Sequence, residues 1–468
     1  MVKKVFLCGI AGTGMSALAG LFKGQGYAVY GSDNRFYPPV DRLLKELDVI
    51  LFQGFAAKNI PADVDFCVIG NAISRGNPEA EAILDRRLEY FSMAEALQRF
   101  FIRGKRSLVV AGSHGKTTSA SFVAHMLEVA GLRPGFFIGG KPVDFAANYR
   151  LAAGDYFVSE GDEYESAFFD RSAKFFKYRP EMLLITALEH DHIDFYRSED
   201  SYLQSFQNLV NQVPGNGRII VNHDYAMARK AVARAFTPVV FYGGPGSDHE
   251  VSGLRPRQGG YDFSLKVGGE VRSFHTRLPG PYNAWNLAAG ILLGHELGLP
   301  AAVVEQAAAS FQGVERRLQV LGTARETVFL SDFAHHPTAI AQVLGGLPDS
   351  YPGRRIIAVF EPRSWSLRRN FFQDRLPAAL ARADEIVIKD VYEKEKIPVA
   401  ERLSLDGVRS ALAALGREAR IFPDFQGIQA YIGALDLGAR QVVVLLSNGD
   451  VREFSDWVQA LCRDMRPV

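Results

Sequence analysis

The sequence predicts an α/β protein of three domains: a Rossmann-like N-terminal domain, a central P-loop ATPase-type parallel sheet with a small antiparallel ribbon, and a Rossmann-like C-terminal domain. Short β-branched apolar runs alternate with helical stretches along the chain, and glycine-rich turns follow two of these runs. The 468 residues are enough for three domains of ~150 residues each. We place them at residues 1–104, 105–322 and 323–468, with the first boundary in a polar, glycine-containing break.

The composition is that of a soluble globular enzyme, with 47% apolar and 22% charged residues and a formal net charge of +1. This charge indicates neither nucleic acid nor an anionic membrane as a partner. No apolar run approaches the ~18 residues of a membrane span, and the first run, Val5–Cys8, predicts a strand instead of a signal peptide. Cys8, Cys67 and Cys462 lack metal or redox spacing, which predicts free thiols and a cytoplasmic location.

The N-terminal segment carries a nucleotide-binding pattern. Glycines at positions 9, 12 and 14 follow the first strand, and the second strand, Tyr27–Tyr30, leads to Ser32 and Asp33. Glycines at a turn with an acidic residue about 20 positions later are typical of dinucleotide-binding folds. Here the register is Gly-x-x-Gly-x-Gly, which favours a nucleotide diphosphate over NAD. A further strand at Phe66–Ile69 continues the α/β alternation.

The strongest single motif is the stretch Ala111–Thr118. It follows the apolar run Leu108–Val110 and leads into a predicted helix, residues 117–131. A glycine-rich turn between strand and helix directs backbone N–H groups at an anion, and the helix dipole adds positive charge. Lys116 can then reach terminal phosphate oxygens and Thr117 a magnesium ion. The alternative is a plain turn with a solvated lysine.

Two clusters of acidic and histidine residues follow predicted strands of the same domain. Tyr156–Ser159 precedes Glu160–Glu163, and Met182–Thr186 precedes Glu189–Asp194. Because the carboxyl ends of parallel strands face the ligand crevice, we expect both clusters beside Lys116, where they can hold magnesium. The alternative is that these charges only solvate loop tips.

The remaining chain predicts a ribbon and a third α/β unit. Residues 250–277 alternate apolar and polar with Gly-Gly turns, which predicts an antiparallel ribbon. A helix is expected at Leu287–Leu297, and Asn283 before it is typical of a helix cap. The expected strands of the third unit are Val328–Leu330, Ile356–Phe360, Glu385–Lys389 and Val442–Leu446.

Taken together, these motifs resemble those of the Mur ligase family, over the full length and in the family's order. The motifs that carry the resemblance are Gly112–Thr118, Glu189-x-Asp191-His192-x-Asp194, Asn283-x-x-Asn286, Gly313-Val314-x-Arg316-Arg317 and Asp332-x-Ala334-His335-His336-Pro337-Thr338. The resemblance implies an ATP-dependent, ADP-forming amide ligase of peptidoglycan synthesis. It further implies ATP, two magnesium ions and UDP-N-acetylmuramate as ligands, and an acyl phosphate intermediate.

Within the family, several stretches are more similar to members that accept the tripeptide L-Ala-γ-D-Glu-meso-diaminopimelate, in peptidoglycan recycling, than to members that accept L-alanine. These stretches are Tyr37–Pro39, Gly70–Pro78, Glu163–Asp170 and Phe360–Ser364. Both acceptors remain open at this point, as does the oligomeric state.

The resemblance also implies residue roles. Lys116, Glu160 and His192 would be the catalytic residues; Thr117 and Glu160 would hold the first magnesium ion and His192 the second. ATP would be bound by Gly112, Ser113, Gly115, Lys116, Thr117, Thr118, Asn283, Asn286, Arg316 and Asp332, so the family match argues against a cap role for Asn283. UDP-N-acetylmuramate would be bound by Ala11, Gly12, Thr13, Gly14, Met15, Ser32, Asp33, Asn71, His114 and Glu163. His335 and Arg363 are further candidates for substrate contact.

The chain departs from the family pattern at Ala187, Tyr282 and Ser331, where the family has Asn, His and Asp. Many relatives also carry a carbamylated lysine ~15 residues after the metal-binding histidine. No lysine lies between His192 and Lys230, so we expect no carbamate here and carboxylates around the second metal instead.

Two other functional classes match parts of the sequence. A nicotinamide-dependent oxidoreductase would explain the first glycine loop but leaves Lys116, Thr117 and both acidic clusters without a role. A nucleotide-dependent switch would bind ATP without consuming it when an amine is supplied. Phosphate release that depends on substrate distinguishes both from a ligase.

Overall fold

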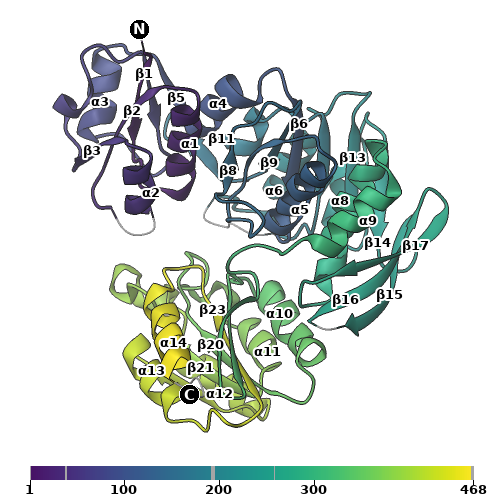
Figure 1. Ribbon diagram of the computed structural model, residues 1–468. Helices are drawn as coiled ribbons and strands as arrows, with labels where there is room; N and C mark the ends of the chain where they lie inside the picture. The colour runs from purple at the N-terminus through teal and green to yellow at the C-terminus, as the bar shows by residue number, and fades with distance from the viewer. Residues whose placement is uncertain (1, 37–39, 191–194, 258, 465–468) are drawn as a thin grey trace. The chain divides into compact units, whose positions relative to one another are not determined.

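The N-terminal segment is a parallel sheet in the computed structural model, which describes residues 2–36, 40–190, 195–257 and 259–464 (Figure 1). The five strands run in the order β3-β2-β1-β4-β5, a Rossmann-like order with β1 at the centre. Residues 5–8 of β1 are fully buried, which explains their uninterrupted apolar sequence. The elements are β1 (Lys4–Cys8), α1 (Thr13–Gly24), β2 (Ala28–Asp33), α2 (Val40–Glu46), β3 (Ile50–Gln53), β4 (Phe66–Ile69), α3 (Pro78–Asp85), β5 (Tyr90–Ser92) and α4 (Met93–Leu97).

The central segment forms a larger sheet whose core strands are parallel. The order is β17-β16-β15-β14-β13-β12-β6-β9-β7-β8, so β6, which precedes the phosphate motif, lies between β12 and β9. This placement confirms that the two acidic clusters follow the neighbours of β6. The elements are β6 (Arg106–Ala111), α5 (Lys116–Val129), β7 (Gly135–Phe137), β8 (Tyr149–Arg150), β9 (Tyr156–Glu160), a hairpin of β10 (Glu165–Ala167) and β11 (Asp170–Ala173), β12 (Met182–Ile185), α6 (Glu199–Val210), β13 (Arg218–Asn222), α7 (Ala226–Val232) and β14 (Val239–Gly243).

The expected ribbon is present at one edge of this sheet. It consists of β15 (His249–Arg257), β16 (Gly260–Val267) and β17 (Glu270–Thr276), and is followed by α8 (Tyr282–Glu296) and α9 (Ala301–Ser310). Two-residue connections join neighbouring strands, which only an antiparallel arrangement allows.

Helix α8 begins five residues earlier than the sequence indicated. It starts directly after a Pro-Gly-Pro turn in which Gly280 has φ +87°. Asn283 therefore lies in the first turn of the helix, and its Nδ2 donates to the carbonyl of Pro279 at 2.7 Å. The cap that composition favoured for Asn283 is wrong, because an N-cap side chain accepts a backbone N–H instead.

The C-terminal segment is a six-stranded sheet in the order β18-β19-β23-β20-β21-β22. The four predicted strands are confirmed, but two edge strands, β18 and β22, were not predicted. Strand β18 pairs antiparallel with β19 and crosses the boundary that we placed at 322/323. The elements are β18 (Gln319–Ala324), β19 (Thr327–Asp332), α10 (Pro337–Ser350), β20 (Arg355–Phe360), α11 (Leu376–Leu380), β21 (Glu385–Lys389), α12 (Leu405–Ala414), β22 (Ala419–Phe422), α13 (Phe425–Gly433), β23 (Gln441–Leu446) and α14 (Arg452–Asp464).

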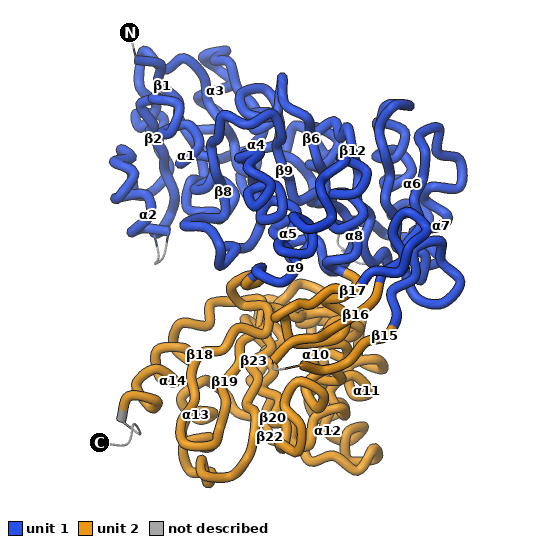
Figure 2. The backbone as a smooth tube through the Cα atoms, turned by 45° about the vertical axis from the view of Figure 1, so that its right-hand side comes forward, with its two compact units in different colours: residues 1–252, 265–272, 286–311 blue, residues 253–264, 273–285, 312–468 orange. Residues whose placement is uncertain are grey.

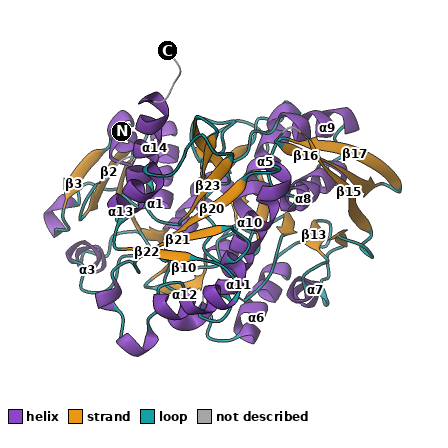
Figure 3. Cartoon of the chain, turned by 90° about the horizontal axis from the view of Figure 1, so that it is seen from below, coloured by secondary structure: helices purple, strands orange, loops and turns teal. Residues whose placement is uncertain are grey.

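Helices cover both faces of this C-terminal sheet (Figure 3). One face packs against α10, α11 and α12 through residues such as Ile340 and Leu412. The other packs against α13 and α14, for example through Ile428 and Phe454. With both faces covered, ligands can approach such a sheet only at the ends of its strands.

By compactness the chain divides into two units (Figure 2). One comprises residues 1–252, 265–272 and 286–311, and the other residues 253–264, 273–285 and 312–468. The N-terminal sheet and the strands β6 to β14 of the central sheet thus share a unit, whereas parts of β15, β16 and β17 belong to the other. No helix of the described residues is long and apolar enough to cross a membrane. The three cysteines are free thiols, and Cys8 and Cys67 are buried.

Candidate active site

The phosphate motif forms a glycine-rich turn at the start of α5, which we call the cradle, with the Lys116 ammonium donating to the carbonyl of Gly112. Gly112 and Gly115 have φ values of +134° and +84°, in the region that favours glycine. Gly115 is the N-cap of this helix and makes no side-chain capping hydrogen bond. The N–H groups at the start of a helix are the donors that bind an anion in such a cradle. A Cβ on Gly115 would overlap the side-chain oxygen of Asn286, which places that predicted nucleotide residue against the cradle.

The segment after β12 holds the cradle in shape. Ser113 donates its backbone N–H to the carbonyl of Ala187 at 2.6 Å, and its hydroxyl donates to the carbonyl of Glu189 at 2.6 Å. The Thr186 hydroxyl donates to the carbonyl of His114 at 2.6 Å. Ala187 thus contributes its backbone carbonyl to the loop. Thr186 is a supporting residue whose role the sequence did not reveal.

Lys116 lies against a carboxylate from the first acidic cluster. Its Nζ is 3.0 Å from Oε1 of Glu163, and the two side chains are 14% and 1% exposed. Burial opposes the ammonium charge, but the carboxylates of Glu163 and Glu160 outweigh it and raise the pKa of Lys116. Tyr202 also approaches Glu163, with its hydroxyl 3.4 Å from Oε1. The contact of Glu163 with the sugar substrate stays a prediction.

The residues predicted for the first magnesium ion are adjacent. The hydroxyl of Thr117 donates to Oε1 of Glu160 at 3.0 Å, and Oε2 of Glu160 accepts the N–H of Gly139 at 2.8 Å. A hydroxyl and a carboxylate beside a phosphate cradle are the oxygen ligands that magnesium prefers, so these residues fit the ion. Asp191, His192 and Asp194 lie outside the described residues, as do Tyr37–Pro39.

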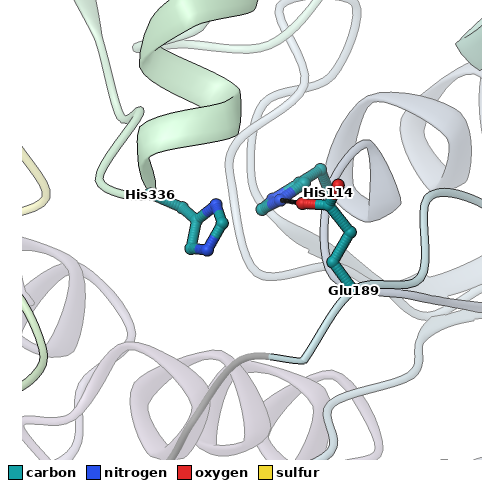
Figure 4. A group of neighbouring side chains, drawn as sticks. All are labelled: His114, Glu189 and His336. Atoms are coloured by element: carbon teal, nitrogen blue, oxygen red, sulfur yellow. Dashed lines mark ion pairs between the residues drawn. The ribbon is translucent and has the colours of Figure 1, made fainter. Parts of the chain in front are cut away.

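The second acidic cluster reaches the cradle through a histidine–carboxylate pair. His114 Nε2 is 3.4 Å from Oε2 of Glu189, and Figure 4 shows the two side chains pointing toward one another. His114 comes from the cradle and Glu189 from the segment after β12. Each cluster thus places one described carboxylate at the cradle, Glu163 at Lys116 and Glu189 at His114.

The N-terminal glycine loop is tied to the end of β2. Asp33 Oδ2 accepts the backbone N–H of Ala11 at 2.9 Å. Gly12 and Thr13 are exposed at the start of α1, where no side chain caps the helix, and Asn71 is exposed after β4. These positions suit a diphosphate at a helix N-terminus. Gly14 is half-buried.

Met15 and Ser32 lie beneath this loop. Both side chains are buried, and the Ser32 hydroxyl donates to the buried carboxylate of Glu79. Glu79 also accepts from Asn59 Nδ2 at 2.7 Å. The structure thus gives Ser32 a supporting place behind the loop, and Glu79, which the sequence did not single out, anchors it.

In the C-terminal unit, Asp332 anchors a backbone loop. Its two carboxylate oxygens accept the N–H groups of Leu318 and Ala334, each at 2.7 Å. Arg316 and Leu318 have φ values of +61° and +48°, which side-chain-bearing residues rarely adopt. Burial raises the pKa of Asp332, against the opposing charge of Arg317. Asp332 is 2% exposed, so its predicted reach to ATP stays a prediction.

The other predicted residues of this unit lie near strand ends. Arg316 Nη2 donates to the carbonyl of Ser447 at 2.7 Å, and His335 Nδ1 is 3.0 Å from the carbonyl of Phe333. His336 caps α10. Arg363 lies over the ring of Tyr392, with its guanidinium carbon 4.1 Å from the ring centre.

A phosphate cradle with carboxylates beside its lysine, on an α/β scaffold, is the arrangement of enzymes that transfer a phosphoryl group from a nucleoside triphosphate. Three family descriptions match consecutive segments: "Mur ligase family, catalytic domain" at residues 4–105, "Mur ligase middle domain" at 110–294, and "Mur ligase, glutamate ligase domain" at 316–449. The chain belongs to the Mur ligase family, whose members form amide bonds at the expense of ATP.

Individual relatives cover most of the chain. The UDP-N-acetylmuramate–L-alanyl-γ-D-glutamyl-meso-2,6-diaminoheptanedioate ligase of Escherichia coli is 36% identical over 82% of this chain and 84% of its own. The UDP-N-acetylmuramate–L-alanine ligase of Acidithiobacillus ferrooxidans is 30% identical over 99% of both chains. The crystal structure of a murein peptide ligase from Psychrobacter arcticus covers 100% of this chain and 99% of its own, with a TM-score of 0.73 and 28% identity.

Proposed function

We propose that this protein joins the lactyl carboxylate of UDP-N-acetylmuramate to the amine of L-Ala-γ-D-Glu-meso-diaminopimelate, with ATP and magnesium, in peptidoglycan recycling. The observation that carries the proposal is the position of Lys116 and Thr117 beside Glu163 and Glu160 at the mouth of the cradle. ATP would phosphorylate the carboxylate, and the amine would displace phosphate from the acyl phosphate.

Negative charge moves between oxygen atoms in both steps. Cations and hydrogen-bond donors in fixed positions should therefore account for most of the stabilisation of the transition states. Lys116 and the N–H groups of Gly115 and Thr117 would bind the β and γ phosphates. Thr117 and Glu160 would hold one magnesium ion, which neutralises phosphate charge, and His192 a second. Asn283 and Asn286 would lie on the adenine side.

The sugar nucleotide would bind at the N-terminal sheet. The exposed start of α1, Gly12 and Thr13, would face the diphosphate, while Asp33 keeps the loop in place. His114 and Glu163 would face the muramoyl group. We assign this role to residues 1–104, nucleotide binding to 105–322 and acceptor binding to 323–468.

The choice of acceptor is supported by identity: 36% to the tripeptide ligase of E. coli against 30% to the L-alanine ligase of A. ferrooxidans. The L-alanine ligase is the second candidate, because that relative matches over nearly the whole of both chains.

Acceptor-dependent phosphate release tests the proposal. Purified protein with ATP, magnesium and UDP-N-acetylmuramate should release phosphate on addition of the tripeptide. Release with L-alanine alone would assign the second candidate. No release with either acceptor would refute a ligase of this kind.

A further inference from the structure

A buried carboxylate outside the phosphate site organises two cations in the C-terminal unit. Glu361, which follows β20, is 1% exposed. Its Oε1 accepts from Lys389 Nζ at 2.7 Å, and its Oε2 accepts from the Ser447 hydroxyl at 2.5 Å. Arg363 Nη1 lies 3.6 Å from Oε1. Each oxygen of this buried carboxylate thus accepts a hydrogen bond, and a second cation lies beside Oε1, so the carboxylate is satisfied and fixes the groups around it.

These residues meet because their strands are neighbours. Glu361 follows β20, Lys389 ends β21 and Ser447 follows β23, and the sheet order is β23-β20-β21. All three thus lie at the carboxyl ends of parallel strands. In open α/β sheets this edge forms the crevice where ligands bind.

The two cations have fixed partners and are partly exposed. The side chains of Lys389 and Arg363 are 17% and 26% exposed. Arg363 lies over the ring of Tyr392, and Lys389 Nζ is 4.4 Å from the ring centre of Phe425. A Cβ on Gly449 would overlap Arg363, so the arginine packs on bare backbone. Two cations share the Glu361 carboxylate, so these three side chains together carry a net positive charge. The carboxylate of Asp450, which Arg363 also influences, pairs with Arg452. Lys389 and Arg363 therefore keep N–H donors for an anion.

The acceptor in the name of the E. coli relative carries such anions. Linkage through the γ-carboxyl leaves the α-carboxylate of its glutamyl residue free, and the diaminoheptanedioate residue adds two more. L-alanine has only the carboxylate next to its reacting amine. In the peptide, the alanine carboxyl is part of an amide bond, and the free carboxylates lie further along, on the second and third residues. A cationic site placed to bind one of those carboxylates therefore favours the peptide over L-alanine.

We propose that Lys389 and Arg363, held in place by Glu361, bind a free carboxylate of the second or third residue of the acceptor and so select the peptide over L-alanine. The proposal rests on the function proposed above. Lys389 and Arg363 are specificity-determining residues, and Glu361 is a positioning residue that does not touch the acceptor.

The first test needs no variant. The wild-type enzyme is assayed with the free tripeptide and with a tripeptide whose free carboxylates are converted to amides. We expect KM to rise about 10- to 100-fold for the amidated acceptor, because a charge-assisted hydrogen bond is lost. We expect kcat to change little. Equal KM values would overturn the proposal, whereas no turnover of the free tripeptide would instead refute the proposed function.

Variants then locate the effect. Lys389→Met should raise KM for the free tripeptide about 10- to 100-fold and leave KM for the amidated one unchanged. Lys394→Met is the control, because this lysine lies five residues away and pairs with Asp390 on the surface. If Lys389→Met raised KM equally for both acceptors, or lowered kcat at constant KM, Lys389 would not bind an acceptor carboxylate, and the proposal would be overturned.

Glu361→Gln tests positioning. It should raise KM for the free tripeptide as Lys389→Met does, and the double variant should be no worse than Lys389→Met alone, because both changes disable the same site. Additive effects, or an unchanged KM with only a lower melting temperature, would contradict the positioning role.

Discussion

Lys116 and Glu163 form an ion pair at the start of α5, with 3.0 Å between Nζ and Oε1 and 1% of the Glu163 side chain exposed. The lysine that should bind phosphate is thus held at the cradle by a buried carboxylate. This arrangement keeps the ammonium charged, because the carboxylates outweigh the effect of burial on its pKa.

Lys116→Ala should abolish substrate-dependent phosphate release, by at least about 100-fold, because one fixed cation at the transferring phosphate is worth that much. Binding of UDP-N-acetylmuramate, measured by calorimetry, should persist, since the glycine loop at Gly12 belongs to another sheet. Lys230→Ala, an exposed lysine of α7, is the control. Loss of phosphate release and sugar-nucleotide binding together would contradict this division of labour.

Thr117→Val should raise the magnesium concentration at half-maximal activity by about 10- to 100-fold, since a group at a metal site is lost. The hydroxyl of Thr117 lies 3.0 Å from Glu160, the other proposed ligand. Ser121→Ala is the matched control, because Ser121 is a buried hydroxyl on the same helix without a hydrogen-bond partner among the described residues. An equal shift in both variants would argue against a magnesium site at Thr117.

Asp332→Ala should destabilise the protein by about 2 to 4 kcal/mol, because two backbone N–H groups lose their acceptor. These are the N–H groups of Leu318 and Ala334. Urea unfolding measures the change. Ser331→Ala should be nearly neutral, since its buried hydroxyl has no partner within the described part of the chain. A similar loss in the free energy of unfolding for both variants would contradict the prediction, because the loss would then not depend on the hydrogen bonds of Asp332.

The same carboxyl gives a pH dependence with a defined sign. Burial raises the folded-state pKa of Asp332 above its ordinary 3.8. At pH values between the ordinary pKa of the unfolded chain and the raised pKa of the folded protein, the folded protein binds more protons than the unfolded chain. The free energy of unfolding therefore falls as pH rises through this range. Asp332→Asn should flatten that part of the stability profile, and an unchanged slope would show that another group causes it.

Activity should not depend on bicarbonate. No lysine lies between His192 and Lys230, so the chain lacks the lysine that many relatives carbamylate near the second metal. Assays in degassed and in bicarbonate-supplemented buffer should agree, and mass spectrometry of peptides should find no carbamylated lysine. A bicarbonate requirement would refute this prediction.

Patterns within short windows could be predicted from the sequence. The strand, turn and helix around Lys116 depend on neighbours in the chain. The parallel order explains why Glu160 reaches Thr117 in the helix and Glu189 reaches His114 in the turn. The start of α8 was misplaced because the Pro279–Pro281 turn was taken as the end of a loop, although it starts the helix directly.

Contacts between distant residues could not be predicted in this way. Glu361 and Lys389 are 28 positions apart and meet only because β20 and β21 are adjacent. Edge strands β18 and β22 were missed because their residues are mostly half-buried and lack a continuous apolar run. Likewise, Asp332 could be assigned to a ligand from its motif, whereas its hydrogen bonds to Leu318 and Ala334 required coordinates.

Product analysis by mass spectrometry tests the central claim most directly. The enzyme is incubated with UDP-N-acetylmuramate, ATP, magnesium and equal concentrations of the tripeptide and L-alanine. We predict that the main product is the sugar nucleotide extended by the tripeptide, with one ADP and one phosphate formed per product. A product carrying L-alanine alone, or no product, would contradict the account.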